Sequence, residues 1–256
     1  MIRAPVAAGL FYPARPAELA ATVDGLLAAA APSSAREGVL GLVAPHAGYV
    51  YSGPIAASAF ARAPRAARVA LLGPAHFVAL EGVAVSAADA WATPLGEVTV
   101  AEDLRRAALA AGAVADDAPH REDHALEVEL PFLQRACPEG LEVLPVAVGR
   151  ASPAEVADLV AALDAFLVVS TDLSHYHEHA TAQRLDRETA EAVVARRPEA
   201  IGSDRACGVF ALRGLVEHAR RRNLEIELLD LRTSADTAGD PWSVVGYGEF
   251  ALRGVE

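Results

Sequence analysis

The chain has 256 residues and a formal net charge of −12, and it contains no lysine, so every basic side chain other than histidine is arginine. The acidic balance argues against nucleic acid as a partner, because phosphate binding needs a basic face. The absence of lysine excludes Schiff-base chemistry, pyridoxal phosphate attachment and a Walker A phosphate loop. Chemistry must therefore come from histidine, carboxylate, cysteine and tyrosine side chains.

The length is ample for one large α/β domain, and no low-complexity linker, charge run or internal repeat divides it, which favours a single domain over residues 1–256. No apolar run approaches the roughly 20 residues of a membrane helix. The first residues lack the apolar core of a secretory signal, so we expect a cytoplasmic protein with no membrane partner. Two cysteines, Cys137 and Cys207, are too few for a disulfide framework.

Helix-like and strand-like segments alternate along the chain. Helical patterns cover 17–30, 54–60, 101–111, 120–133, 152–164, 181–197 and 207–222. Apolar or alternating runs predict strands at 38–43, 68–73, 82–86, 98–100, 141–149, 166–170, 224–231 and 243–252, with a turn-rich connection at 91–96. The clearest helix start is Ser152, followed by Pro153 and Glu155 in the pattern of a capping box. This alternation is typical of a three-layer αβα protein, here with a mixed central sheet.

Three of the predicted strands run directly into histidines. The strand at 38–43 leads to His46, the strand at 68–73 leads to His76, and the strand at 166–170 leads through Asp172 to His175. The carboxyl edge of the strands is where open α/β folds build their sites, so we expect these residues to form one site. Neutral imidazole is the commonest protein ligand for zinc, iron and copper, and His46 and His76 are therefore a candidate metal pair if their strands are neighbours.

The segment 172–179 carries one carboxylate and three histidines. Its spacing allows Asp172 to hold one ring nitrogen of His175 and leave the other free, an arrangement that serves an acid–base histidine or supports a metal ligand. His177 and His179 extend the run into something similar to a metal-binding tract. We expect these last two histidines to be solvated, because the strand has ended before them.

Cys207 stands where a helix begins. A helix N-terminus and nearby imidazoles favour thiolate, the form that binds metal, whereas a small buried hydrophobe is the alternative for a free cysteine. Cys137, at a helix end, is interpreted as structural. The predicted helix at 120–133 is entered through acidic residues, and helical spacing puts Glu127 on one face with Asp123 or His124. His124 and Glu127 are either pocket residues or part of the wet face of this helix.

These motifs together resemble the Memo-like family, whose bacterial and archaeal members are called AmmeMemoRadiSam system protein B. The resemblance covers nearly the whole chain in order. The residues that carry it are Gly9-Leu10-Phe11-Tyr12-Pro13, Ala44-Pro45-His46-Ala47-Gly48-Tyr49, Gly73-Pro74-Ala75-His76, Asp123-His124 with Glu127 and Leu130-Pro131, Ser170-Thr171-Asp172-Leu173-Ser174-His175, Cys207-Gly208 and Tyr247-Gly248-Glu249-Phe250.

The family is similar in fold to the class III extradiol dioxygenases, which hold Fe(II) with two histidines and a carboxylate. The resemblance implies that His46, His76 and Cys207 bind the metal, iron or copper more readily than zinc, and that His175, beside Asp172, is the acid–base residue. A thiolate in place of the carboxylate argues against ring cleavage, because a soft ligand shifts preference toward copper(I) or zinc and is prone to oxidation. The resemblance to the Memo-like family also implies a working link to a radical S-adenosylmethionine protein.

Three functions remain open on the sequence alone. The first is a mononuclear metal site that runs oxidative chemistry on an unidentified small molecule. The second is a non-catalytic module that keeps the dioxygenase-like pocket for a peptide or partner protein, with Tyr49 among the aromatic residues that would line it. The third is a zinc hydrolase that uses the same three ligands and a bound water.

Overall fold

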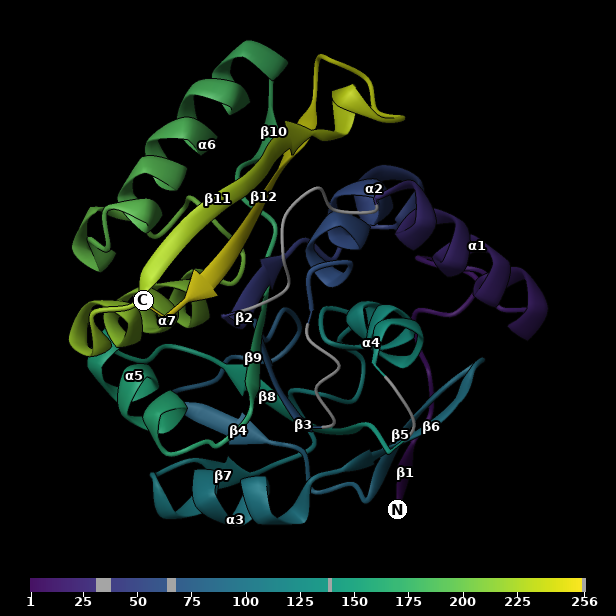
Figure 1. Ribbon diagram of the computed structural model, residues 1–256, viewed down its shortest axis with the longest axis vertical. Helices are drawn as coiled ribbons and strands as arrows, with labels where there is room; N and C mark the ends of the chain where they lie inside the picture. The colour runs from purple at the N-terminus through teal and green to yellow at the C-terminus, as the bar shows by residue number, and fades with distance from the viewer. Residues whose placement is uncertain (31–37, 64–67, 138–139, 255–256) are drawn as a thin grey trace.

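A computed structural model describes residues 1–30, 38–63, 68–137 and 140–254, in which strands and helices alternate (Figure 1). Four strands form the centre of a large sheet, in the order β8 (Glu142–Val148), β3 (Arg68–Gly73), β9 (Phe166–Ser170) and β2 (Val39–Ala44). All three pairings among them are parallel. Their residues are almost entirely apolar and buried, as a parallel sheet covered on both faces requires.

Mixed pairings extend this parallel centre in both directions. Beyond β8 the sheet continues through β6 (Gly96–Val100), β5 (Ala90–Thr93) and β1 (Ile2–Arg3), with β5 and β6 antiparallel. The short strands β4 (Val83–Val85) and β7 (Val114–Ala115) attach to β8 through β4. Beyond β2, the antiparallel β12 (Val244–Arg253) pairs with both β11 (Glu225–Thr233) and β10 (His175–His177). The prediction of a mixed sheet is therefore confirmed.

Helices flank the sheet. In Figure 1, α1 (Pro16–Ala29), α2 (Tyr49–Phe60) and α4 (Leu130–Ala136) lie on one side of β2 and β9, and α5 (Pro153–Ala161), α6 (His179–Val194) and α7 (Val209–Arg222) lie on the other. The helix α3 (Glu102–Ala110) packs beside β4 and β8. In the described ranges, no helix is both long and apolar enough to cross a bilayer.

Local sequence signals located the start of α5 but not that of α2. The predicted capping box is present at the start of α5, where the Ser152 hydroxyl accepts the Glu155 amide and the Glu155 carboxylate accepts the Ser152 amide. The helix predicted from residue 54 begins earlier, at Tyr49, and continues through Pro54. The expected turn-rich connection at 91–96 is instead the hairpin of β5 and β6, which turns at Pro94 and Leu95 before Gly96, where φ is 117°.

The predicted helix at 120–133 is wrong over its first half. Residues 120–126 are irregular, Glu127–Glu129 form a single 3₁₀ turn, and α4 starts only at Leu130. The reason is that the acidic residues bind partners outside the segment. Asp123 accepts the amide of His76, and Glu127 accepts the amides of Val6 and Ala7. Of the two alternatives for this segment, the solvated face is therefore wrong for Asp123 and Glu127, whose carboxylates make buried contacts.

Candidate metal centre

His46 and His76 meet at the carboxyl edge of the sheet. His46 follows the end of β2 and His76 follows the end of β3, and β9 lies between these two strands, so the histidine strands are next-nearest neighbours. Their ring centroids are 5.3 Å apart. His46 is 2% exposed, whereas the His76 side chain is 25% exposed, so the centre opens to solvent on the His76 side.

Cys207 reaches the same point from the other end of the chain. Its Sγ lies 3.3 Å from Nε2 of His46, and the candidate ligand atoms of His46, His76 and Cys207 all lie within 4.8 Å of one another. The segment that carries it is held against the end of β9, because the Cys207 amide donates to the carbonyl of Asp172 and the Gly208 amide donates to the Thr171 hydroxyl. A Cβ on Gly208 would come within 2.8 Å of the Thr171 Cβ, so only glycine permits this approach.

Both histidines are oriented through Nδ1, which directs Nε2 toward the centre. Nδ1 of His46 lies 2.8 Å from the Ser170 hydroxyl, and Nδ1 of His76 lies 3.0 Å from Oδ1 of Asp123. The Asp123 carboxylate also accepts the His76 amide at 2.6 Å. Hydrogen-bonded support of this kind fixes the tautomer of a metal-ligating histidine and raises its basicity.

The surroundings of the three side chains fit a cation. Glu129 and Asp172 are both buried beside the centre, and burial raises the pKa of each, that of Asp172 to about 7. Within the described part of the chain, Oε2 of Glu129 has no hydrogen-bond partner. Two imidazole nitrogens and one sulfur form a donor set that suits zinc, iron or copper rather than magnesium or calcium.

The environment of Cys207 favours its protonated form. Burial raises the pKa of the Cys207 thiol to about 12, with the Asp172 charge as the next cause, and these outweigh the hydrogen bonds with the Thr171 hydroxyl and with backbone groups that lower it. Of the two alternatives for Cys207, the pKa therefore favours the buried, protonated thiol in the metal-free protein. A bound cation would have to displace the proton. Burial also holds the pKa of His46 well below its usual value, so this histidine is neutral and ready to bind.

Asp172 and His175 do not make the contact that their spacing suggested. Oδ1 of Asp172 accepts the His46 amide at 3.0 Å, so this carboxylate fixes the loop after β2. Nδ1 of His175 lies 2.8 Å from the Leu173 carbonyl oxygen, which orients the ring in place of Asp172. Burial is the first cause that lowers the pKa of His175, and His76 is close enough to lower it further.

His124 lies in the centre, whereas Glu127 does not join it. The His124 ring stacks on His76 with centroids 5.0 Å apart and on Phe11 at 4.1 Å. Glu127 is fully buried and accepts hydrogen bonds from Arg3, Tyr12 and two N-terminal amides. Tyr49 is also buried, and its hydroxyl donates to the Val128 carbonyl, which is a packing role.

A second set of candidate ligand atoms belongs to His76, Asp123 and His124. Both Asp123 oxygens already accept N–H groups, from His76 and from the Ala125 amide. The set is therefore better explained as support for His76. His177 is exposed and His179 bonds to Thr233, so neither histidine is placed with His46. Cys137 is buried, which agrees with its structural interpretation.

Sequence reasoning missed several residues that shape the centre. Ser170 and Glu129 support His46, and Phe11 covers His124. Asp123 was placed on a helix face, but its contact is with His76, 47 residues earlier in the chain. The local sequence pattern does not predict contacts between residues so far apart in the chain. The one available signal is position, since Ser170 ends a strand whose neighbours carry the histidines.

Comparison with known proteins extends the similarity over the whole chain. A family model described as Memo-like protein matches residues 3–251. A MEMO1 family protein of Methanococcoides burtonii is 34% identical, with 98% of this chain and 100% of the relative covered. MEMO1 family protein MK0963 of Methanopyrus kandleri is 33% identical with 99% of each chain covered, and one of Thermotoga maritima is 33% identical with 96% of this chain and 98% of the relative covered.

Proposed function

This chain belongs to the Memo-like protein family, and on that premise we propose that it is a metal-dependent oxidoreductase with one mononuclear His46, His76 and Cys207 site. The observation that carries the proposal is the convergence of two imidazole nitrogens and one sulfur, from segments far apart in sequence, within 4.8 Å of one another. Two carboxyl groups, Glu129 and Asp172, are buried beside the centre without a described basic side chain in contact, and burial raises the pKa of each, so a bound cation would favour their ionised forms.

Iron or copper fits the proposed function better than zinc does. Either ion, when bound, supplies one-electron redox chemistry and open coordination positions. The protein's own residues position the two histidine ligands and transfer protons. Asp172 holds the His46 loop through its amide, Asp123 holds His76, and His175 is the proposed acid–base residue. The lowered pKa of His175 keeps the ring neutral near pH 7, so it is ready to accept a proton.

The domain count and the layer arrangement of the fold are part of the same proposal. We infer a single domain over residues 1–256 with a three-layer αβα arrangement like that of class III extradiol dioxygenases. The Cys207 sulfur stands where those enzymes have a carboxylate, so ring cleavage is not the reaction we propose. A working partnership with a radical S-adenosylmethionine protein and a cytoplasmic location stay predictions.

Oxygen-free purification followed by metal analysis tests the proposal. Stoichiometric iron or copper in the wild type, lost in His46→Ala and in Cys207→Ala, is the expected result. His179→Ala is the matched control, because this histidine bonds to Thr233 away from the centre and its removal should leave the metal content unchanged. His175→Ala should keep the metal but lose turnover.

Two other outcomes would replace the proposed function. Stoichiometric zinc together with esterase activity would indicate a hydrolase that uses the same side chains. A protein that takes up no metal and loses no function in His46→Ala would be a binding module for a peptide or partner protein.

A further inference from the structure

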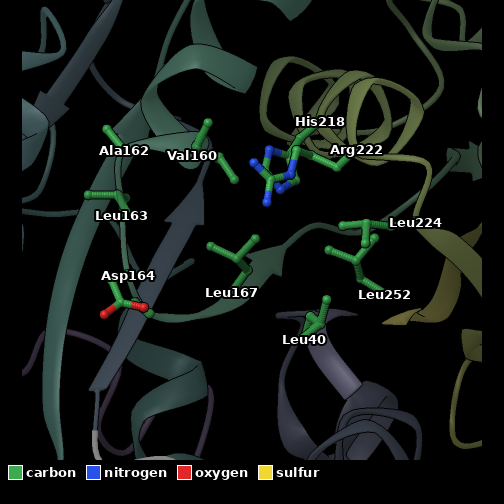
Figure 2. Close-up of a pocket in the computed structure, with 12 residues that line it drawn as sticks. Leu40, Val160, Ala162, Leu163, Asp164, Leu167, His218, Arg222, Leu224 and Leu252 are labelled. Carbon is green, nitrogen blue, oxygen red and sulfur yellow. The ribbon is translucent and has the colours of Figure 1, made fainter. Parts of the chain in front are cut away.

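A second concave site lies at the opposite edge of the sheet from the metal centre, and it is independent of the proposed function. Figure 2 shows this cavity, which we call the amino-edge cavity, and its volume is about 390 Å³. Leu40 and Leu167 come from the first residues of β2 and β9, and Leu252 comes from the last residues of the antiparallel β12. The cavity therefore sits where β2 and β9 begin, whereas His46 follows the end of β2.

The cavity has an apolar floor and a basic wall. Leucine side chains surround the hollow in Figure 2, and the ends of α5 and α7 close its sides. His218 and Arg222 are four residues apart on α7, so they share one face of that helix. Figure 2 shows both side chains directed into the hollow, next to each other, with Asp164 across the cavity from them.

Arg222 differs from its neighbours on the same helical turn. Arg220 and Arg221 both form ion pairs with Glu217, and Arg221 also pairs with Asp158. No carboxylate among the residues that the structure describes lies within ion-pair distance of Arg222. Burial and the neighbouring Arg222 charge lower the pKa of His218 despite its hydrogen bond to the Ala157 backbone, so this ring is neutral and Arg222 supplies the positive charge of the wall.

We propose that the amino-edge cavity binds a small amphipathic carboxylate, with its apolar part on the leucine floor and its carboxylate against Arg222. Planar guanidinium and carboxylate groups form paired, charge-assisted hydrogen bonds, which gives the head group a definite position. The volume lies at the lower end of the roughly 300–1,000 Å³ range of small-ligand pockets. Asp164 at the far end repels a second negative charge, which favours a monocarboxylate.

Octanoate is the probe for the first test, titrated calorimetrically into the full-length protein. We expect saturable binding of one octanoate per chain. Arg222→Gln should weaken it at least tenfold, because the charged partner of the head group is gone. Arg220→Gln is the matched control: it removes the same charge two residues earlier on α7, outside the cavity lining, and should leave octanoate binding unchanged.

Octylamine and acetate test separately whether the carboxylate and the apolar tail of octanoate are recognised. Octylamine carries the same tail with the opposite charge, and acetate carries the carboxylate without the tail, so both should bind at least tenfold more weakly than octanoate. Methyl NMR provides a second measurement on the wild type, in which octanoate should shift the signals of Leu167 and Leu252. Equal octanoate affinity in Arg222→Gln, equal affinity for octylamine, or no saturable binding to the wild type would each overturn the proposal.

Discussion

Metal binding should release one proton from this protein, and that proton should come from Cys207. Burial raises the pKa of the thiol to about 12. A solution at pH 8 is therefore about four pH units below this pKa, and the thiol is protonated. Removing the proton at that pH costs about 5 kcal/mol, since each unit corresponds to about 1.36 kcal/mol. The metal–sulfur bond must offset this cost. Asp172, with a pKa of about 7, is already ionised at pH 8 and His46 is already neutral, so the thiol is the remaining source among these three.

The assay is calorimetric titration of the metal-free protein with Zn²⁺ in two buffers of different ionisation enthalpy. We expect at least one proton released per ion between pH 7.5 and 8.5, and an apparent affinity that rises at least about tenfold per pH unit, because one ligand must be deprotonated. Cys137→Ser is the control, since it removes the other buried thiol and should leave the proton yield unchanged. Uptake of Zn²⁺ without proton release would refute the coordination by Cys207.

Three further predictions concern the residues around the centre and the core. Asp123→Asn should lower metal affinity about ten- to a hundredfold by removing the carboxylate that orients His76, as measured by competition with a chelator. Glu127→Ala should lower the free energy of unfolding by about 3–5 kcal/mol in urea denaturation, because it leaves the Arg3 charge buried without its partner; a loss below about 1 kcal/mol would contradict this. Burial raises the pKa of Glu249 to about 8 despite Arg62, so the stability this group contributes is fully present below its unfolded pKa and is lost as pH rises through 8. Glu249→Gln should therefore flatten the fall in stability between pH 5 and 8, and an unchanged slope would contradict the assignment.

The parts of the fold that the sequence predicted are those that local chemistry decides. The central strands β2, β3 and β9 were visible as short apolar runs because both of their faces are buried. The start of α5 was visible because its capping box lies within four residues. The positions of His46 and His76 at strand ends followed from the same strands, although nothing local could show that β9 lies between them.

The errors arose where long-range contacts outweigh local spacing. The segment 120–126 has charges at helical spacing, but Asp123 and Glu127 bind His76 and Arg3, which are 47 and 124 residues away. Likewise Asp172 is three residues from His175, yet it accepts the amide of His46 instead. The choice between thiolate and buried thiol at Cys207 stayed open for a related reason, since the burial of the side chain depends on packing that the sequence does not state.

The most direct measurement of the central claim is X-ray absorption at the edge of the bound metal. For the zinc-loaded protein, coordination by His46, His76 and Cys207 predicts one sulfur at about 2.3 Å and nitrogens at about 2.0–2.1 Å. Cys207→Ser should lose the sulfur contribution, and Cys137→Ser should keep it. A shell of nitrogen and oxygen alone in the wild type, or a sulfur signal that survives Cys207→Ser, would contradict the account.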